Sequence, residues 1–146
     1  MAQLMNVKVN GTGTVMRLDA VAGKHQIAVD EPVTMGGKDS AADPLSTFLA
    51  SLLACENVMA QIIAKEMEFD LQGISFETEG TIDVSGLMGN LEVDPKFQEV
   101  KVKAYVTTNE SQERIDQMRN AVDQRCPIFR TIKDAGIPIT NEWVKA

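Results

Sequence analysis

The chain has 146 residues, 44% of them apolar, which suits a single globular domain with its own core. Its 14 Lys and Arg residues against 21 Asp and Glu residues give a formal net charge of −7. So acidic a chain lacks the basic face that nucleic acid or an anionic membrane requires. We therefore expect one domain over residues 1–146, with no nucleic-acid partner and no membrane partner.

The chain holds two cysteines, Cys55 and Cys126, and a single histidine, His25. Two thiols cannot build a disulfide scaffold, and these three residues are too few and too widely spaced for a four-ligand metal site. Residues 1–14 have neither the basic start nor the apolar run of a secretory signal. We therefore expect a cytoplasmic protein without a metal.

The first 33 residues predict strands. Apolar and polar residues alternate over residues 5–9, until Gly11 and Gly13 break the run, and alternate again over residues 26–30. The sequence Ala22-Gly23-Lys24 predicts a turn before the later strand. The following loop, residues 32–43, fits neither a phosphate-binding loop nor a dinucleotide motif, so we interpret it as a structural or rim loop.

A long apolar helix is the strongest local signal. Asp43 is a good N-cap, Pro44 suits the first helical position, and apolar residues occupy almost every direction over residues 45–63. Its length would allow a membrane span, but its polar side chains are too many for lipid and it lacks anchoring flanks. We therefore predict a core helix that is buried on several sides.

The second half predicts strands, then helices, then a strand. The segments are strands within residues 74–84 and 100–106, a helix beginning at Asn109 or Ser111, a shorter helix after Cys126-Pro127 that Gly136 ends, and a strand over residues 137–144. Clean alternation in the strands is typical of an antiparallel sheet with one face exposed to water. The predicted fold class is α+β, with the long helix against an antiparallel sheet.

Each cysteine has two open interpretations. Cys55 lies in mid-helix on an apolar stripe, where a free cysteine is most often a small buried hydrophobe, and a thiolate there would need a cation from elsewhere. Cys126 precedes Pro127 at the expected N-cap of a helix, beside Arg125. That position favours a lowered thiol pKa, and the alternative is a shielded cap residue.

Glu56 is the one charged residue of the apolar helix, so it must face an edge, a polar pocket or a cation. An exposed edge of the helix is the simplest interpretation. The candidate cations from the N-terminal half are Arg17, Lys24 and Lys38.

His25 begins a predicted strand beside a turn, where it is most simply exposed, and a general base for Cys55 is the second interpretation. The chain has eight methionines. Those at helical spacing are best interpreted as core filler rather than a binding surface: Met59, Met67 and Met118.

Three motifs together resemble the OsmC/Ohr family, the osmotically inducible and organic hydroperoxide resistance proteins. They are Asp43-Pro44-Leu45 at the start of the helix, Leu52-Leu53-Ala54-Cys55 within it, and Arg125-Cys126-Pro127. The segments upstream, from Gly23-Lys24-His25 to Gly36-Gly37, look like the OsmC-like branch. The resemblance runs from about residue 7 to residue 144.

The resemblance implies an intertwined α+β homodimer, in which two long helices pack between sheets and an active site lies at each end of the interface. The family's enzymes are thiol peroxidases for organic hydroperoxides, and they need no metal and no organic cofactor. Cys55 matches the peroxidatic cysteine, which becomes a sulfenic acid, and Cys126 matches the resolving cysteine. Their disulfide would be reopened by a dithiol reductant of the lipoyl or thioredoxin-like kind.

The sequence departs from the family at the groups that activate the peroxidatic thiol. Family enzymes use an Arg from the N-terminal strands, held by a Glu just after the Pro that opens the helix. Here Leu45 and Ser46 follow that Pro, and the Arg position falls near Lys24 or Arg17. Glu56, directly after Cys55, is the candidate to replace the missing carboxylate, but it faces about 100° away from Cys55 around the helix.

Two other functions therefore remain open. One is a non-catalytic, stress-related homodimer that binds a small apolar ligand in the interface cleft. The other is a thiol redox sensor, which would turn over slowly but oxidise easily at Cys55 and Cys126.

Overall fold

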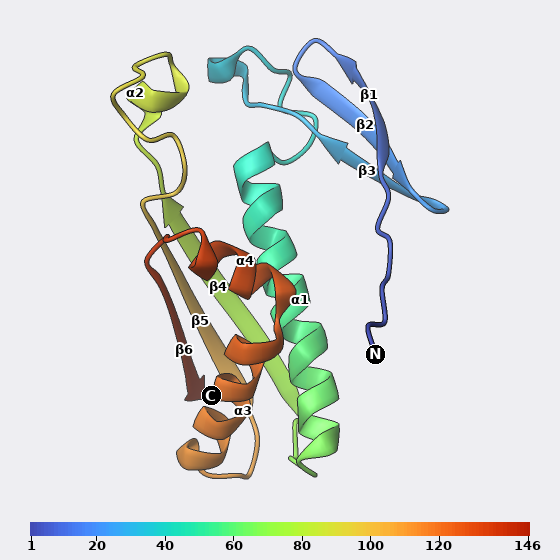
Figure 1. Cartoon of the computed structure of the whole chain (residues 1–146), viewed down its shortest axis with the longest axis vertical. Coiled ribbons are helices and arrows are strands. Elements are labelled where there is room, and N and C mark those ends of the chain that lie inside the picture. The colour runs from blue at the N-terminus through green and yellow to red at the C-terminus, as the bar shows by residue number, and fades with distance from the viewer. The chain divides into compact units, whose positions relative to one another are not determined.

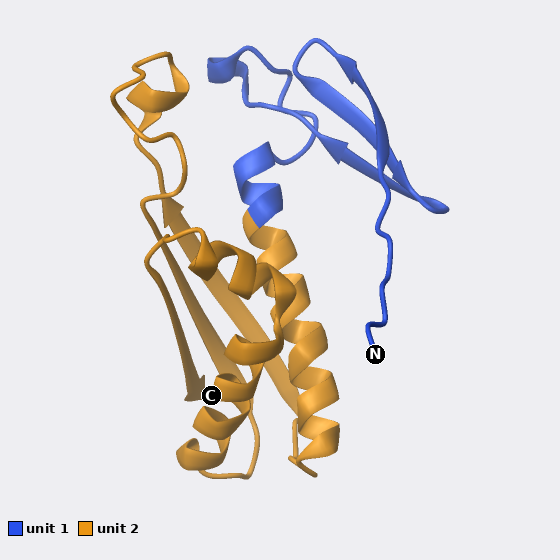
Figure 2. Cartoon of the chain, viewed as in Figure 1, with its two compact units in different colours: residues 1–48 blue, residues 49–146 orange.

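The computed structural model describes all 146 residues, which form two compact units, Met1–Phe48 and Leu49–Ala146 (Figure 2). The α+β class is confirmed, with two three-stranded sheets and one long helix (Figure 1). That both units form the single domain expected over residues 1–146 stays a prediction. The elements in chain order are β1 (Asn10–Thr14), β2 (Arg17–Ala22), β3 (His25–Val29), η1 (Val33–Met35), α1 (Pro44–Glu66), β4 (Gly73–Thr81), α2 (Val84–Leu87), β5 (Glu99–Thr107), α3 (Gln112–Arg125), α4 (Pro127–Asp134) and β6 (Ile139–Lys145).

In the first unit, β1, β2 and β3 form an antiparallel sheet in that order. The predicted turn before β3 is confirmed, with Gly23 at a φ of 64° that favours glycine. The strand predicted over residues 5–9 is wrong, because β1 begins at Asn10 and contains both glycines expected to break it. The short β2 pairs with β1 from Thr14↔Arg17 to Asn10↔Val21. Residues 5–9 therefore have no residues of β2 opposite them to pair with.

The loop after β3 is held by a buried carboxylate. Asp30 accepts hydrogen bonds from the backbone N–H groups of Glu31, Lys38 and Ser40, and from the Ser40 hydroxyl. These bonds lower the pKa of Asp30 to about 2. Gly37 is required here, since a Cβ would lie 1.9 Å from the Glu31 carbonyl oxygen. The loop's interpretation as structural agrees with this arrangement.

The long helix begins as predicted. The Asp43 carboxylate accepts from the backbone N–H of Ser46 at 2.9 Å, and Pro44 takes the first helical position. Within this chain α1 buries one face alone, made by Leu52, Glu56, Ala60, Ile63 and Ala64. The expectation of burial on several sides is therefore not met by a single copy.

Part of the remaining surface of α1 is apolar. Val58 and Ile62, one turn apart, are 55% and 44% exposed. By length and composition α1 could cross a membrane, but a core helix of a soluble domain passes the same test. Its buried carboxyl group and its packing against a sheet favour the second description.

In the second unit, β4, β5 and β6 form a sheet in that order, and α3 and α4 complete its core with α1 (Figure 1). The strand β6 runs parallel to β5, so the prediction of a purely antiparallel sheet is wrong. Two helices lie between β5 and β6 in sequence, and a long helical connection is what returns a chain in the parallel sense. The methionines expected in the core, Met59, Met67 and Met118, contribute to it.

Side chains of α3 cover the free edge of β6. The Gln112 side-chain amide donates to the Trp143 carbonyl at 2.7 Å and its oxygen accepts from the Lys145 N–H at 3.1 Å. Arg119 donates to the Asn141 carbonyl at 3.4 Å. An amide side chain thus makes the bonds that a further strand would make.

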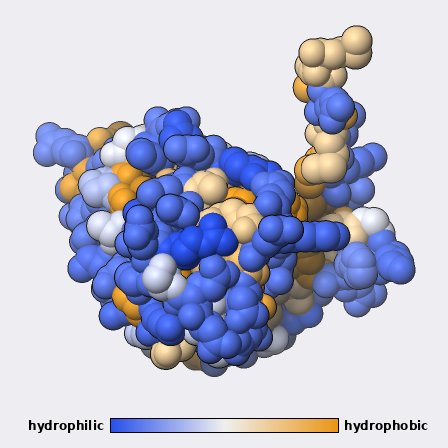
Figure 3. All heavy atoms as spheres, turned by 90° about the horizontal axis from the view of Figure 1, so that it is seen from below, coloured by the Kyte–Doolittle hydropathy of each residue, from blue (hydrophilic) through white to orange (hydrophobic).

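The face shown in Figure 3 is largely hydrophilic, with hydrophobic residues gathered in smaller patches. This agrees with a chain in which 24% of residues are charged.

Candidate functional site

The structure brings together the two cysteines that the sequence singled out. The Sγ of Cys126 lies 3.0 Å from the Sγ of Cys55, and both thiols are free. Cys55 is half-buried on α1, and Cys126 is fully buried between α3 and α4. Because the sulfurs are in contact, the pair needs little movement to form a bond of about 2.05 Å.

Cys126 caps α4 as predicted, since its Sγ accepts from the Phe129 N–H at 3.5 Å and Pro127 follows it. Of its two interpretations, the lowered thiol pKa is wrong, whereas the shielded cap residue agrees with the structure. Burial first, and then the hydrogen bond to Cys55, raise the pKa of Cys126 to about 12. Desolvation of a fully buried sulfur therefore outweighs the partial positive charge at the start of a short helix.

The guanidinium of Arg125 pairs with a residue other than the neighbouring Cys126. It makes a two-pronged ion pair with Glu66 near the C-terminus of α1, at 2.6 and 3.0 Å. This pair is largely exposed and raises the pKa of Arg125 through the hydrogen bond to Glu66. The cation next to Cys126 in sequence is thus directed to another group.

Glu56 is fully buried, so its interpretation as an exposed helix edge is wrong. Its Oε1 accepts from the Nδ2 of Asn141, and its Oε2 has no hydrogen-bond partner. Burial raises the pKa of Glu56 to about 8, against a lowering by the Asn141 hydrogen bond. The group that meets Glu56 is therefore a neutral amide of β6, and none of the three predicted cations.

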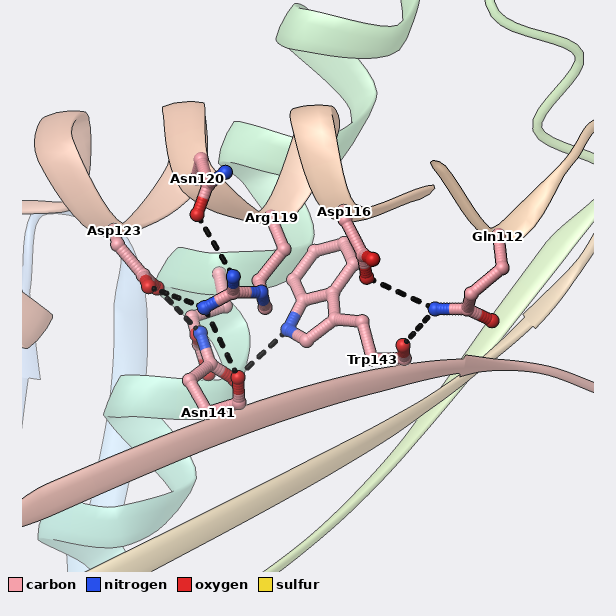
Figure 4. Close-up of polar contacts among 8 residues, drawn as sticks. Gln112, Asp116, Arg119, Asn120, Asp123, Asn141 and Trp143 are labelled. Atoms are coloured by element: carbon pink, nitrogen blue, oxygen red, sulfur yellow. Dashed lines mark hydrogen bonds and ion pairs between the residues drawn. The ribbon is translucent and has the colours of Figure 1, made fainter. Parts of the chain in front are cut away.

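Asn141 is the centre of a network that the sequence did not reveal (Figure 4). It donates to Asp123 at 2.7 Å as well as to Glu56, and its Oδ1 accepts from the Trp143 indole at 2.8 Å. Arg119 pairs with Asp123 at 3.1 Å, while burial raises the pKa of Asp123. One signal in the sequence could have indicated this network. Asn141 is a polar residue at an inward-facing position of the predicted last strand, where an apolar residue is expected.

The N-terminal candidates all lie in the first unit, Met1–Phe48. His25 is exposed at the start of β3, as its simplest interpretation predicted. Arg17 binds Asp19 at 2.8 Å and donates to the Ser40 hydroxyl at 2.8 Å. Lys24 is exposed in the turn between β2 and β3.

No group of three or more His, Cys, Asp or Glu side chains is placed to hold a metal ion. The second unit does hold a contacting thiol pair, and such a pair can carry out nucleophilic attack, oxidation and disulfide exchange.

Comparison with known proteins identifies the family and the fold. The family model described as OsmC-like protein matches residues 37–142. An OsmC-like protein from Mycoplasma pneumoniae has a similar structure, with a TM-score of 0.85 at 17% identity, over 97% of this chain and 98% of that one. No curated protein matches significantly.

Two other similar structures are organic hydroperoxide resistance proteins. That of Elizabethkingia anophelis has a TM-score of 0.77 at 18% identity, over 100% of both chains. OhrB of Bacillus subtilis has a TM-score of 0.70 at 18% identity, over 97% of this chain and 100% of that one. At such identities the likeness shows the shared fold.

Proposed function

Because the chain belongs to the OsmC-like protein family, we propose that it is a thiol-dependent peroxidase that reduces organic hydroperoxides through Cys55 and Cys126. Family membership and the hydroperoxide resistance proteins among its structural neighbours support a role in peroxide stress. The observation that carries the catalytic proposal is the 3.0 Å contact between the two sulfurs.

In the first step Cys55 is the attacking residue, because it is only half-buried and a hydroperoxide can reach it, whereas Cys126 is fully buried. The Cys126 S–H donates a hydrogen bond to the Cys55 sulfur. The Cys55 thiolate attacks the terminal oxygen of the hydroperoxide and the O–O bond breaks. The alkoxide leaves with a proton as an alcohol, and Cys55 becomes a sulfenic acid.

In the second step the Cys126 sulfur attacks the sulfur of the Cys55 sulfenic acid. Because the pKa of Cys126 is raised to about 12, its proton must leave as the S–S bond forms. The departing hydroxide takes this proton and leaves as water. The product is a disulfide, which a dithiol of the lipoyl or thioredoxin-like kind reduces by exchange, and no metal or organic cofactor takes part.

We further propose that two copies of the chain assemble through α1. Val58 and Ile62 are exposed apolar side chains on the side of α1 away from Glu56, and a second α1 would remove them from water. Cys55 lies at the border of this face and is half-buried, so a partner helix would complete the walls of its site. The free thiols suit a cytoplasmic location, where disulfides are kept reduced.

The test is consumption of cumene hydroperoxide by the purified protein in the presence of dihydrolipoamide. The wild type should consume the hydroperoxide catalytically, and Cys55→Ser should not exceed the rate without protein. Equal rates for the two proteins would contradict the peroxidase proposal.

A redox sensor is the second candidate, favoured by the 3.0 Å contact between the two sulfurs, which makes their disulfide easy to form. It predicts that a single addition of hydroperoxide oxidises both cysteines, while turnover with the dithiol stays slow.

A further inference from the structure

We propose that Glu56, Asn141 and Asp123 form a buried brace that positions Cys55 against Cys126. The brace deepens the proposed function, since it concerns the same thiol pair, but it makes a claim about disulfide formation that needs no peroxide. These three residues are positioning residues, because they act on the sulfurs through the elements that carry them.

Each end of the brace is close in sequence to one cysteine. Glu56 directly follows Cys55 on α1. Asp123 is on the last turn of α3, and the Cys126 N–H bonds to the Val122 carbonyl at 2.8 Å, so Cys126 is fixed to that same turn. Any shift of α3 relative to α1 therefore changes both the brace and the distance between the sulfurs.

Asn141 joins the two ends with every polar group of its amide in use. One N–H goes to Glu56. The other goes to Asp123, and the Oδ1 accepts from Trp143 (Figure 4). A flipped amide would set its oxygen against two carboxyl groups and its N–H against the indole N–H. The amide thus has one orientation, and it holds α1 and α3 at one register on β6.

Trp143 fixes Asn141 in turn. The indole is 1% exposed and packs edge-to-face on Phe76 of β4, with 5.9 Å between the ring centroids. The brace is therefore joined to the sheet through a buried ring contact between β6 and β4.

The brace is a costly way to fill a core. Glu56 leaves Oε2 without a partner, and both Glu56 and Asp123 have raised pKa values because they lose hydration. Apolar side chains of similar volume would stabilise such a core at least as well. What apolar side chains would not provide is a single directional link between the two helices that carry the cysteines.

Precise placement matters here because a disulfide has strict geometry. The Cβ–Sγ–Sγ–Cβ dihedral must lie near 90° and the Cα atoms within about 7 Å. Two thiols that are free to drift apart close this bond less often, so the effective concentration of one for the other falls.

The test is equilibrium of the full-length protein with glutathione. Oxidised glutathione takes two electrons and two protons from the cysteine pair, giving the Cys55–Cys126 disulfide and two molecules of reduced glutathione. Alkylation and mass measurement give the oxidised fraction at each glutathione ratio. Asn141→Leu should lower the effective concentration of the pair about tenfold, which equals about 30 mV in potential.

Two variants separate positioning from loss of packing. Glu56→Gln keeps an oxygen that can accept from Asn141, so its equilibrium should stay within about twofold of the wild type. Asn120→Ala, the control, removes an exposed amide that accepts from Arg119 at 2.8 Å, outside the brace, and should change nothing.

An Asn141→Leu protein that folds and keeps the wild-type glutathione equilibrium would overturn the proposal. If Asn141→Leu does not fold, Asp123→Leu breaks the brace at its half-buried end and is judged by the same criterion. Peroxidase activity is not measured in either experiment. A wild type without peroxidase activity but with a shifted equilibrium in the variants would refute the proposed function and leave the brace standing.

Discussion

The Sγ atoms of Cys55 and Cys126 lie 3.0 Å apart, although 71 positions separate the two residues in the chain. One sulfur is on the middle of a long helix and is half-buried, and the other caps a short helix and is fully buried. This asymmetry assigns different roles to the two thiols, and those roles can be tested separately.

Replacement of the buried thiol should trap the oxidised form of the other. In Cys126→Ser, one equivalent of hydroperoxide should leave Cys55 as a sulfenic acid, because no sulfur remains to condense with it. Dimedone should then add to Cys55, as seen by mass spectrometry. The wild type should instead form the intramolecular disulfide and give little adduct, and an adduct on Cys126 in Cys55→Ser would contradict the assignment.

Stability should fall with rising pH because of Glu56. Its folded-state pKa of about 8 lies above the ordinary glutamate value of 4.5, so the folded protein binds this proton more tightly than the unfolded chain. The stabilisation is complete below about pH 4.5 and is lost as the pH rises to 8, by up to about 1.4 kcal/mol per pH unit. Urea unfolding between pH 5 and pH 8 measures it.

Glu56→Gln is the control for this slope, since glutamine does not titrate. Asp123, whose pKa burial also raises, should leave part of the slope in that variant. The same dependence of unfolding free energy on pH in both proteins would show that Glu56 is not the group responsible.

Asp30 should have the opposite pH dependence. Hydrogen bonds from Ser40 and the loop N–H groups lower its pKa to about 2, so its stabilisation is present above about pH 4 and lost as the pH falls towards 2. Asp30→Asn should lower the melting temperature at pH 7 and have little effect at pH 2. Asp39→Asn, an exposed neighbour in the same loop, serves as the matched control.

The two faces of α1 should respond differently to substitution. Leu52 is fully buried, so Leu52→Ala should lower the free energy of unfolding by about 2–5 kcal/mol through a cavity. Val58→Asp, on the exposed face, should instead convert dimers to monomers in sedimentation. Gln124→Asp adds the same charge to an exposed position of α3 and should leave the assembly unchanged. A wild type that sediments as a monomer would rule out the proposed dimer.

Local signals in the sequence predicted much of the fold. Asp43-Pro44 marks the start of α1 and Ser111 the start of α3, because both caps depend on bonds within one turn. The alternation in β4 and β5 also agrees with the observed strands, since it depends on one buried face. Its extension to residue 84 is wrong, because β4 ends at Thr81 and Asp83 caps the short helix α2. Cys126 was correctly placed as a helix cap for the same local reason.

Other features depend on contacts between distant segments, which no local pattern contains. Asn141 meets Glu56 across 85 positions, and this contact decides that the carboxyl group is buried rather than exposed. The pKa of Cys126 was predicted in the wrong direction, because a helix end is visible in the sequence and the depth of burial is not. The length of β2, not the pattern of residues 5–9, decided where β1 begins.

The Gln112 amide has a consequence for how the protein avoids aggregation. By occupying the Trp143 carbonyl and the Lys145 N–H, it leaves the outer margin of β6 unable to template another strand there. The outer margin of β4 is the other edge of this sheet. Continued addition of strands at both edges, as in a cross-β stack, is therefore blocked on the β6 side at these backbone groups.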